Sequence, residues 1–346
     1  MNKPPIHPAT KRRVRWSTVA GVALIALAIA GFLWGESIQL AWSQRTVAGG
    51  FDASKIPLQS ERTYGYLKEI CDIGPRISAT EGMRKQQELL KNHFEKLGAK
   101  VSLQEFDARH PETGQRVRLA NQIVEWHPEK RDRILICCHY DTRPYPDREP
   151  DPAKRRDPFI GANDGGSGVA MLMELGNHMA GLRSKYGVDF VFFDGEELVY
   201  DDQVRRDPYF LGSEHFAREY ASHPPGHKYR WGVLVDMIGD KNLTMYREEN
   251  SMAWPDTRPL VLDLWKTAAS LGVKEFVNVT RHEIRDDHLA LRNIAKIPTC
   301  DVIDFEYPTA RGESYWHTTR DVPENCSGES ICKVGYVISE WLKRVK

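Results

Sequence analysis

Hydrophobic and polar positions follow two alternating periods from about residue 60 to the end of the chain. Met83, Leu90, Phe94 and Leu97 recur at helical spacing behind a Ser-x-Thr-Glu capping pattern, which predicts a helix over 80–97. The same period predicts further helices over 165–180, 213–221, 256–271, 286–295 and 328–344.

Short apolar runs rich in β-branched residues separate most of these helices and predict strands. They cover 101–106, 117–125, 134–139, 188–193, 231–237 and 299–303. Strands that alternate with helices favour a largely parallel sheet with helices on both faces. We therefore expect a single α/β domain with a central mixed, mostly parallel sheet flanked by helices.

A different pattern marks the N-terminus, where residues 16–35 carry no charge and residues 1–15 are basic. Twenty apolar residues are enough to span a bilayer as a helix, and the basic flank should stay cytoplasmic. The sequence thus predicts a basic tail, a transmembrane signal anchor over 16–35, a linker over 36–58 and an extracytoplasmic catalytic domain over 59–346. The alternative is a signal peptide cleaved after the small residues at 28–30, which would give a secreted protein.

Composition narrows the class of protein. The 346 residues contain 48 Lys and Arg against 48 Asp and Glu, and 41% are hydrophobic, as expected for a globular protein. The balanced charge gives no field that attracts a polyanion, so nucleic acid is not an expected partner. After export, Cys326 and Cys332 would be free to form a disulfide.

Acidic residues and histidines follow the predicted strands. His139 and Asp141 come after one run, Glu196 and Glu197 after the next, and Asp236 ends a third. Further candidates open helices or follow the last strand: Asp164, Asp286, Asp287, Trp316 and His317. Open α/β sheets bind ligands at the carboxyl ends of their strands, so these side chains should share one edge of the sheet.

A single strand-terminal Asp more often caps a helix, but clustered carboxylates at one edge need a compensating cation. Zn²⁺ accepts Asp, Glu and His together, and three protein ligands with an open position form the catalytic kind of site. We expect Asp164, Glu197 and His317 to be these ligands. Glu196 would then be free as the general acid and base, with Asp236 and Asp287 as its hydrogen-bonding partners.

The motifs, taken in order, resemble those of the glutaminyl cyclases and of the zinc aminopeptidases that share their fold. The resemblance runs from about residue 63 to 343. It rests on HYDT at 139–142, GANDGGSG at 161–168, FFDGEE at 192–197, YFLGSEHFA at 209–217, VDMIGD at 235–240, DDHLALR at 286–292 and YWHT at 315–318.

The resemblance implies different metal contents for the two groups. A cyclase would hold one zinc through Asp164, Glu197 and His317, while Glu196 moves a proton from the α-amine of an N-terminal Gln to the departing ammonia. An aminopeptidase would add a second zinc on His139 and Asp236, with Asp164 bridging the two ions. Trp316 matches a tryptophan of the cyclase substrate pocket.

Some features favour a cyclase and others an aminopeptidase. The long insert over 198–210, the DDH motif and Trp316 resemble cyclases, whereas Asn163 with the two glycines after Asp164 resembles the aminopeptidase metal loop. The insert lacks the tryptophan expected of cyclases and offers Tyr200 as a substrate contact. We expect a cyclase acting on the N-termini of peptides or proteins, with an aminopeptidase as the alternative. A metal-free binding module is a third possibility that the intact ligand positions disfavour.

Overall fold

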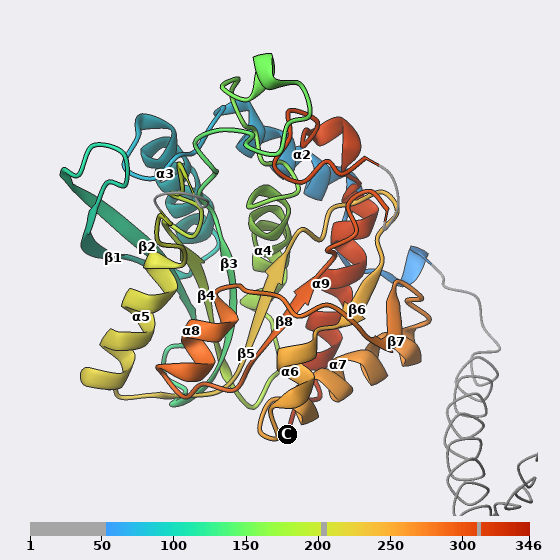
Figure 1. Cartoon of the computed structure of the whole chain (residues 1–346). Helices are drawn as coiled ribbons and strands as arrows, with labels where there is room; N and C mark the ends of the chain where they lie inside the picture. The colour runs from blue at the N-terminus through green and yellow to red at the C-terminus, as the bar shows by residue number, and fades with distance from the viewer. Residues whose placement is uncertain (1–52, 202–205, 310–312) are drawn as a thin grey trace, which may run out of the picture. The chain divides into compact units, whose positions relative to one another are not determined.

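The computed structural model describes residues 53–201, 206–309 and 313–346 (Figure 1). Within these ranges six strands form one mixed sheet in the order β1-β2-β4-β3-β5-β8. They are β1 (Lys100–Arg109), β2 (Arg116–Trp126), β3 (Asp132–His139), β4 (Gly187–Phe193), β5 (Lys228–Asp236) and β8 (Thr299–Ile303). The expected single α/β domain with a mixed, mostly parallel sheet is confirmed.

Strand direction follows from the connections. β1 and β2 are joined by a short loop with no helix, so they pair antiparallel, and β2 also runs antiparallel to β4. β4, β3, β5 and β8 are parallel to one another, and helices lie in the connections between them. The helices are α2 (Ser60–Asp72), α3 (Glu81–Lys96), α4 (Gly166–Met179), α5 (Leu211–Ser222), α6 (Glu249–Ala253), α7 (Arg258–Leu271), α8 (His288–Asn293) and α9 (Gly328–Leu342).

Two hydrophobic cores cover the two faces of the sheet. Along β3, Ile134 and Ile136 pack into the larger core with residues of α2, α3, α4, α7 and α9. Leu135 and Cys137 point the other way, into a smaller core with residues of α5 and α8. All residues of β4 are buried, which explains why the central strands lack the alternation of polar and apolar residues.

Elements with weak sequence signals were not predicted. α2 buries Thr63 and Cys71 beside Leu67 and Ile70, so its apolar face is short of aliphatic residues. α6 has five residues and β6 (Met245–Arg247) has three, too few for a period to appear. β6 pairs in parallel with β7 (Phe276–Thr280) beside the main sheet.

Two expectations about the exported state have different outcomes. The tail over 1–15, the anchor over 16–35 and most of the linker lie outside the described residues. In the part that is described, no helix is both long and apolar enough to cross a bilayer. The disulfide that the sequence left open is not formed, because Cys326 and Cys332 are both buried as free thiols. Cys332 faces α2, where its Sγ lies 3.0 Å from Thr63 Oγ1.

Candidate metal centre and active site

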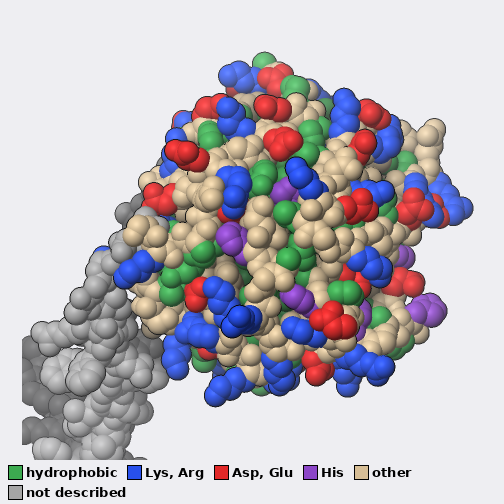
Figure 2. All heavy atoms as spheres, turned by 180° about the vertical axis from the view of Figure 1, so that it is seen from behind, with side chains coloured by type: hydrophobic (Ala, Val, Ile, Leu, Met, Phe, Trp, Pro, Cys, Tyr) green, Lys and Arg blue, Asp and Glu red, His purple; other side chains and the backbone are tan. Residues whose placement is uncertain are grey.

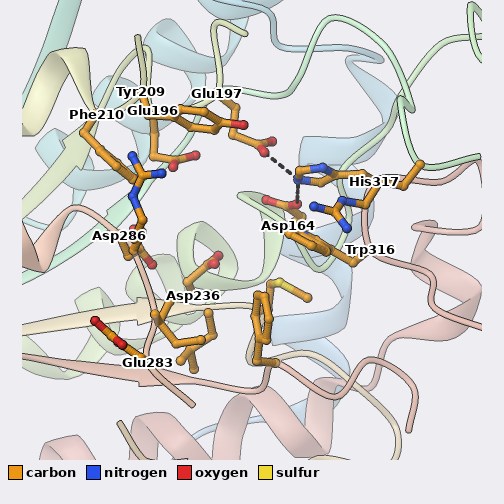
Figure 3. A pocket seen from close by; sticks show the side chains of 16 residues that line it. Asp164, Glu196, Glu197, Tyr209, Phe210, Asp236, Glu283, Asp286, Trp316 and His317 are labelled. Atoms are coloured by element: carbon orange, nitrogen blue, oxygen red, sulfur yellow. Dashed lines mark ion pairs between the residues drawn. The ribbon is translucent and has the colours of Figure 1, made fainter. Parts of the chain in front are cut away.

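The parallel strands deliver the predicted acids and histidines to one edge of the sheet. His139 ends β3, Asp236 ends β5, and Glu196 and Glu197 follow β4. Asp164 lies just before α4, and His317 lies in the segment after β8. Figure 3 shows Asp164, Glu197 and His317 converging on one point, with Glu196 and Asp236 close by.

The loop that carries Asp164 is held by backbone geometry and by a buried acid. Gly165 has φ +79°, and a Cβ there would lie 2.7 Å from the carbonyl oxygen of Asp141. The Asp321 carboxylate accepts hydrogen bonds from the backbone N–H of Asn163 at 2.7 Å and of Asp164 at 3.1 Å. Only glycine fits at position 165, and Asp321 fixes the direction of Asp164.

A second buried acid positions the glutamate doublet. The Asp141 carboxylate accepts from the backbone N–H of Glu196 at 3.2 Å and of Glu197 at 2.9 Å. The doublet lies in the bend after β4, and its two carboxylates point to different partners. Glu197 reaches His317, while Glu196 Oε2 lies 3.9 Å from His139 Nδ1.

Two sets of ligand atoms share Asp164. His317 Nε2 lies 2.7 Å from Glu197 Oε1 and 3.4 Å from Asp164 Oδ2. On the other side, His139 Nε2 lies 3.2 Å from both Asp164 Oδ1 and Asp236 Oδ1. Each set offers three buried donors whose ligand atoms all lie within 4.8 Å of one another. The arrangement allows one or two metal ions, with Asp164 as the shared ligand.

The polar atoms of this cluster fit a cation. Asp164 Oδ2 and Glu197 Oε2 are buried without a hydrogen-bond partner, and buried carboxylate oxygens need one. Two carboxylates and one imidazole match the mixed oxygen and nitrogen donors of catalytic zinc. The residues therefore fit zinc, and the expected zinc dependence is consistent with this chemistry.

Burial and neighbouring charges shift the pKa values of the side chains in this cluster. Burial alone would lower the pKa of His317, but the carboxylates of Glu197, Asp147 and Asp164 together outweigh burial and raise the pKa to about 10. Burial raises the pKa of Glu196 well above its ordinary value, and neighbouring Glu197 and Asp286 raise it further, against the opposing effect of His139. Without a metal, protons compensate the crowded carboxylates, and a bound cation would replace them.

An arginine and an aspartate behind the ligands were missed by the sequence analysis. Buried Arg143 donates from Nη1 to Glu197 Oε1 at 3.1 Å and from Nε and Nη2 to the two Asp147 oxygens at 2.9 and 3.1 Å. Asp147 Oδ1 in turn lies 3.2 Å from His317 Nδ1. Together they tie two metal ligands to each other. Charged, proline-rich stretches such as theirs are usually solvated loops, so the sequence carries no signal for this role.

The candidate centre opens into a cavity of about 370 Å³ (Figure 3). Asp286 lines this cavity, whereas the predicted Asp287 does not and is fully buried. Asp286, Asp236 and Glu196 therefore form the acidic side of the cavity. We expected Asp287 to be the hydrogen-bonding acid here, and it is the adjacent Asp286 that lines the cavity.

Aromatic side chains form the walls. The predicted Trp316 lines the cavity, stacked on the Arg148 guanidinium at 4.0 Å and against the Phe305 ring at 5.0 Å. Tyr200 does not line it and instead packs on His110 at 5.0 Å between ring centroids. Tyr209, from the same insert, occupies the wall position, and its hydroxyl oxygen accepts a hydrogen bond from Arg143 Nη2 at 3.1 Å.

The sequence and the fold of this chain match those of known proteins. Residues 121–342 match the model of peptidase family M28, and the chain belongs to that family. A structure of Fimbriiglobus ruber glutaminyl cyclase is 42% identical, covers 83% of this chain and 95% of that chain, and has a TM-score of 0.78. The expected likeness to glutaminyl cyclases is confirmed.

Two further relatives mark the range of the family. A Zn-dependent exopeptidase from Parabacteroides distasonis is 31% identical, covers 86% of this chain and all of that chain, and has a TM-score of 0.74. The glutaminyl-peptide cyclotransferase of Gloydius blomhoffii is 26% identical over 248 residues. That match spans 63% of this chain and 63% of the relative's length.

Proposed function

We propose that this protein is a zinc-dependent glutaminyl-peptide cyclotransferase. It would convert the N-terminal Gln of peptides or proteins to pyroglutamate and release ammonia. The observation that carries the proposal is the 42% identity to a glutaminyl cyclase across most of the chain, with Asp164, Glu197, His317 and Glu196 converging in one cavity.

The reaction needs one proton transfer, and Glu196 is placed for it. The α-amine nitrogen of the substrate attacks the side-chain amide carbon, a new C–N bond forms, and the bond to the amide nitrogen breaks. Glu196 takes the proton from the attacking nitrogen and gives it to the departing ammonia, so the residue ends as it began. Its raised pKa suits a group that must hold this proton in passing.

Zinc on Asp164, Glu197 and His317 would polarise the amide carbonyl of the substrate when bound. The chain supplies the remaining parts of the site. Asp236 and Asp286 accept hydrogen bonds on the acidic side of the cavity, where the substrate amine would lie. Tyr209 and Trp316 are aromatic walls that exclude water from the reacting atoms.

The size of the cavity agrees with a substrate that inserts one residue. About 370 Å³ is at the lower end of the range for ligand sites, which is about 300–1,000 Å³. The terminal Gln would fill it, and the rest of the peptide would remain outside against Arg148 and Arg285 at the rim.

An aminopeptidase remains the second candidate because of one specific observation. The set made by His139, Asp164 and Asp236 is complete, so a second zinc has ligands. With two ions bound, Glu196 would act as the base toward water instead of the substrate amine.

Mass spectrometry of a single reaction separates the two candidates. The zinc-loaded protein is incubated with one Gln-initiated and one Leu-initiated peptide, both with free amines. We expect the Gln peptide to lose ammonia and the Leu peptide to stay intact. Stepwise loss of N-terminal residues would establish the aminopeptidase instead.

We further propose that residues 16–35 anchor the protein in the cytoplasmic membrane and leave the catalytic domain on the extracytoplasmic side. The support is the uncharged run itself with its basic flank. Full-length protein should fractionate with membranes, and a chain lacking residues 1–35 should not. A mature protein that begins near residue 31 would support secretion after cleavage.

A further inference from the structure

Positive charge gathers at the sheet edge opposite the cavity. We define the amino-end face as the five segments at the amino ends of β3, β4, β5 and β8 and at the end of α9, namely 127–132, 180–187, 222–230, 293–298 and 343–346. They contain ten Lys and Arg against two Asp and Glu, although the whole chain carries 48 of each. Because the four strands are parallel, these segments share one edge.

The charges surround a hollow of about 690 Å³, lined by Lys185, Lys228, Arg230, Lys296 and Lys346 among others. All five of these side chains belong to exposed residues. In Figure 2, Lys and Arg side chains run along the lower rim of the back face, where this edge lies. The cluster cannot be recognised in the sequence, because its residues come from five separate segments.

The lining charges are not neutralised within the protein. Among the ion pairs of the described residues, none includes any of the five lining side chains, whereas Lys100 and Lys333 each pair with a glutamate. Lys185 lies 5.2 Å from the Tyr186 ring, and the Arg230 guanidinium stacks 4.5 Å from the Trp231 ring. Basic side chains without acidic partners, next to aromatic rings, are typical of a surface that binds an anionic partner.

We propose that the amino-end face docks on anionic phospholipid headgroups. Charge complementarity selects a negative partner, and the expected anchor would hold this domain close to a bilayer. Residues 36–52 number 17, so at about 3.4 Å each they would keep residue 53 within about 60 Å of an anchored helix. Docking in this orientation turns the carboxyl ends of the strands, and the cavity, away from the membrane.

The proposal is independent of the chemistry at the cavity and is tested without the anchor. In the described part of the chain, the buried core consists of residues from Leu58 onward, so residues 51–346 contain the whole core and fold by themselves. This chain is sedimented with vesicles of phosphatidylcholine, with or without phosphatidylglycerol. The expected result is binding only where phosphatidylglycerol is present, with loss at high salt.

Charge reversal with a matched control locates the binding. Lys185→Glu, Lys228→Glu and Lys296→Glu together should weaken vesicle binding by at least about 100-fold, since each lysine near such a surface contributes about fivefold. The control reverses three exposed lysines on α2 and α3, Lys68, Lys85 and Lys91, and should keep the binding. Peptide turnover should be unchanged in both variants.

Three results would overturn the proposal. They are no binding to phosphatidylglycerol vesicles, an equal loss of binding in the control variant, and tighter binding to a DNA duplex than to the vesicles at the same salt concentration. The last result would mean that the face recognises polyanions in general.

Discussion

Glu196 and Glu197 are neighbours in sequence, yet their carboxylates serve different purposes. Glu197 Oε1 lies 2.7 Å from His317 Nε2 and 3.1 Å from Arg143 Nη1. For Glu196, burial together with its acidic neighbours raises the pKa. This difference in environment, set by the hydrogen bonds of Asp141 to both backbone N–H groups, is the basis of the proposed division between metal ligand and proton carrier.

Replacing Glu196 tests that division. Glu196→Gln keeps the shape and removes the proton carrier, so turnover should fall by about 10²–10⁴-fold while zinc remains bound. The measurement pairs ammonia release with metal analysis of the same sample. Glu88→Gln, exposed on α3, is the control and should behave like the unchanged protein. Full activity of Glu196→Gln would remove this residue from the mechanism.

Asp147 is the second residue whose role can be isolated. Its carboxylate contacts His317 Nδ1 and both branches of the Arg143 guanidinium, and these contacts outweigh burial and lower its pKa to about 2. Asp147→Asn should weaken zinc binding by about 10–100-fold. Competition with a zinc-binding dye measures the change.

The control for Asp147 is chosen from the same loop. Asp151→Asn removes an aspartate that caps the short 3-10 helix η2 (Pro152–Lys154) and has no contact with the metal ligands. It should leave zinc affinity unchanged. Equal zinc affinity in the Asp147 and Asp151 variants would show that the Asp147 contact to His317 does not support the metal.

The residues differ in how far the sequence could identify them. Asp164, Glu197 and His317 stand in motifs at strand ends or beside a helix start, and topology brings such positions together. Asp286 and Asp287 are adjacent, and only the start of α8 decides which one faces the cavity. Arg143 and Asp147 look like solvated residues until Glu197 and His317 are placed against them.

At the scale of elements, the turn from Gly161 into α4 is the feature on which the metal loop depends. Gly165→Ala would force a Cβ to within 2.7 Å of Asp141 O at a positive φ. We expect a loss of stability of about 1–3 kcal/mol and weaker zinc binding. Thermal unfolding and zinc titration measure the two effects.

Gly181→Ala is the matched control for this substitution. A Cβ at Gly181 meets nothing within 4 Å, and its φ is not in the left-handed region. This variant should unfold within a degree or two of the unchanged protein. If both alanine variants were equally stable, the backbone of the metal loop would not require glycine.

Helices and strands with a clear hydrophobic period could be predicted from the sequence, and those without one could not. α3, α4, α9 and β8 lie within two residues of their expected bounds, because each buries a continuous apolar face. α2 was missed because its buried face mixes Thr63 and Cys71 with aliphatic residues. The order of the strands in the sheet also could not be obtained from periodicity, since it depends on which helices cross which face.

Across the whole molecule, acidic side chains gather at the sheet edge that holds the cavity, and basic side chains gather at the opposite edge. Burial raises the pKa of Asp304 and Asp321 to about 7, so the folded metal-free protein keeps protons that the unfolded chain loses near pH 4. These groups make the metal-free protein less stable as pH rises from about 4 to 7. The raised pKa of His317 acts in the same direction. The unfolded chain loses this proton near pH 6.5 and the folded protein near pH 10, so its contribution to stability is lost as pH rises between these values.

Zinc reverses this dependence, because it binds ionised carboxylates and a neutral imidazole. The increase in melting temperature caused by zinc should therefore be larger at pH 8 than at pH 5.5. The comparison is made between zinc-loaded and EDTA-treated samples in the same buffers. An increase that is equal at both pH values, or larger at pH 5.5, would contradict the assignment of His317 and its carboxylate neighbours as the zinc ligands.

One zinc held by Asp164, Glu197 and His317, with Glu196 beside it, would be enough to cyclise N-terminal Gln. The decisive measurement is a titration of zinc into EDTA-treated protein while ammonia release from a Gln-initiated peptide is followed. We expect the rate to rise in proportion to added zinc and to stop rising at one equivalent per chain. No ammonia at any zinc content, or a rate that needs two equivalents, would contradict it.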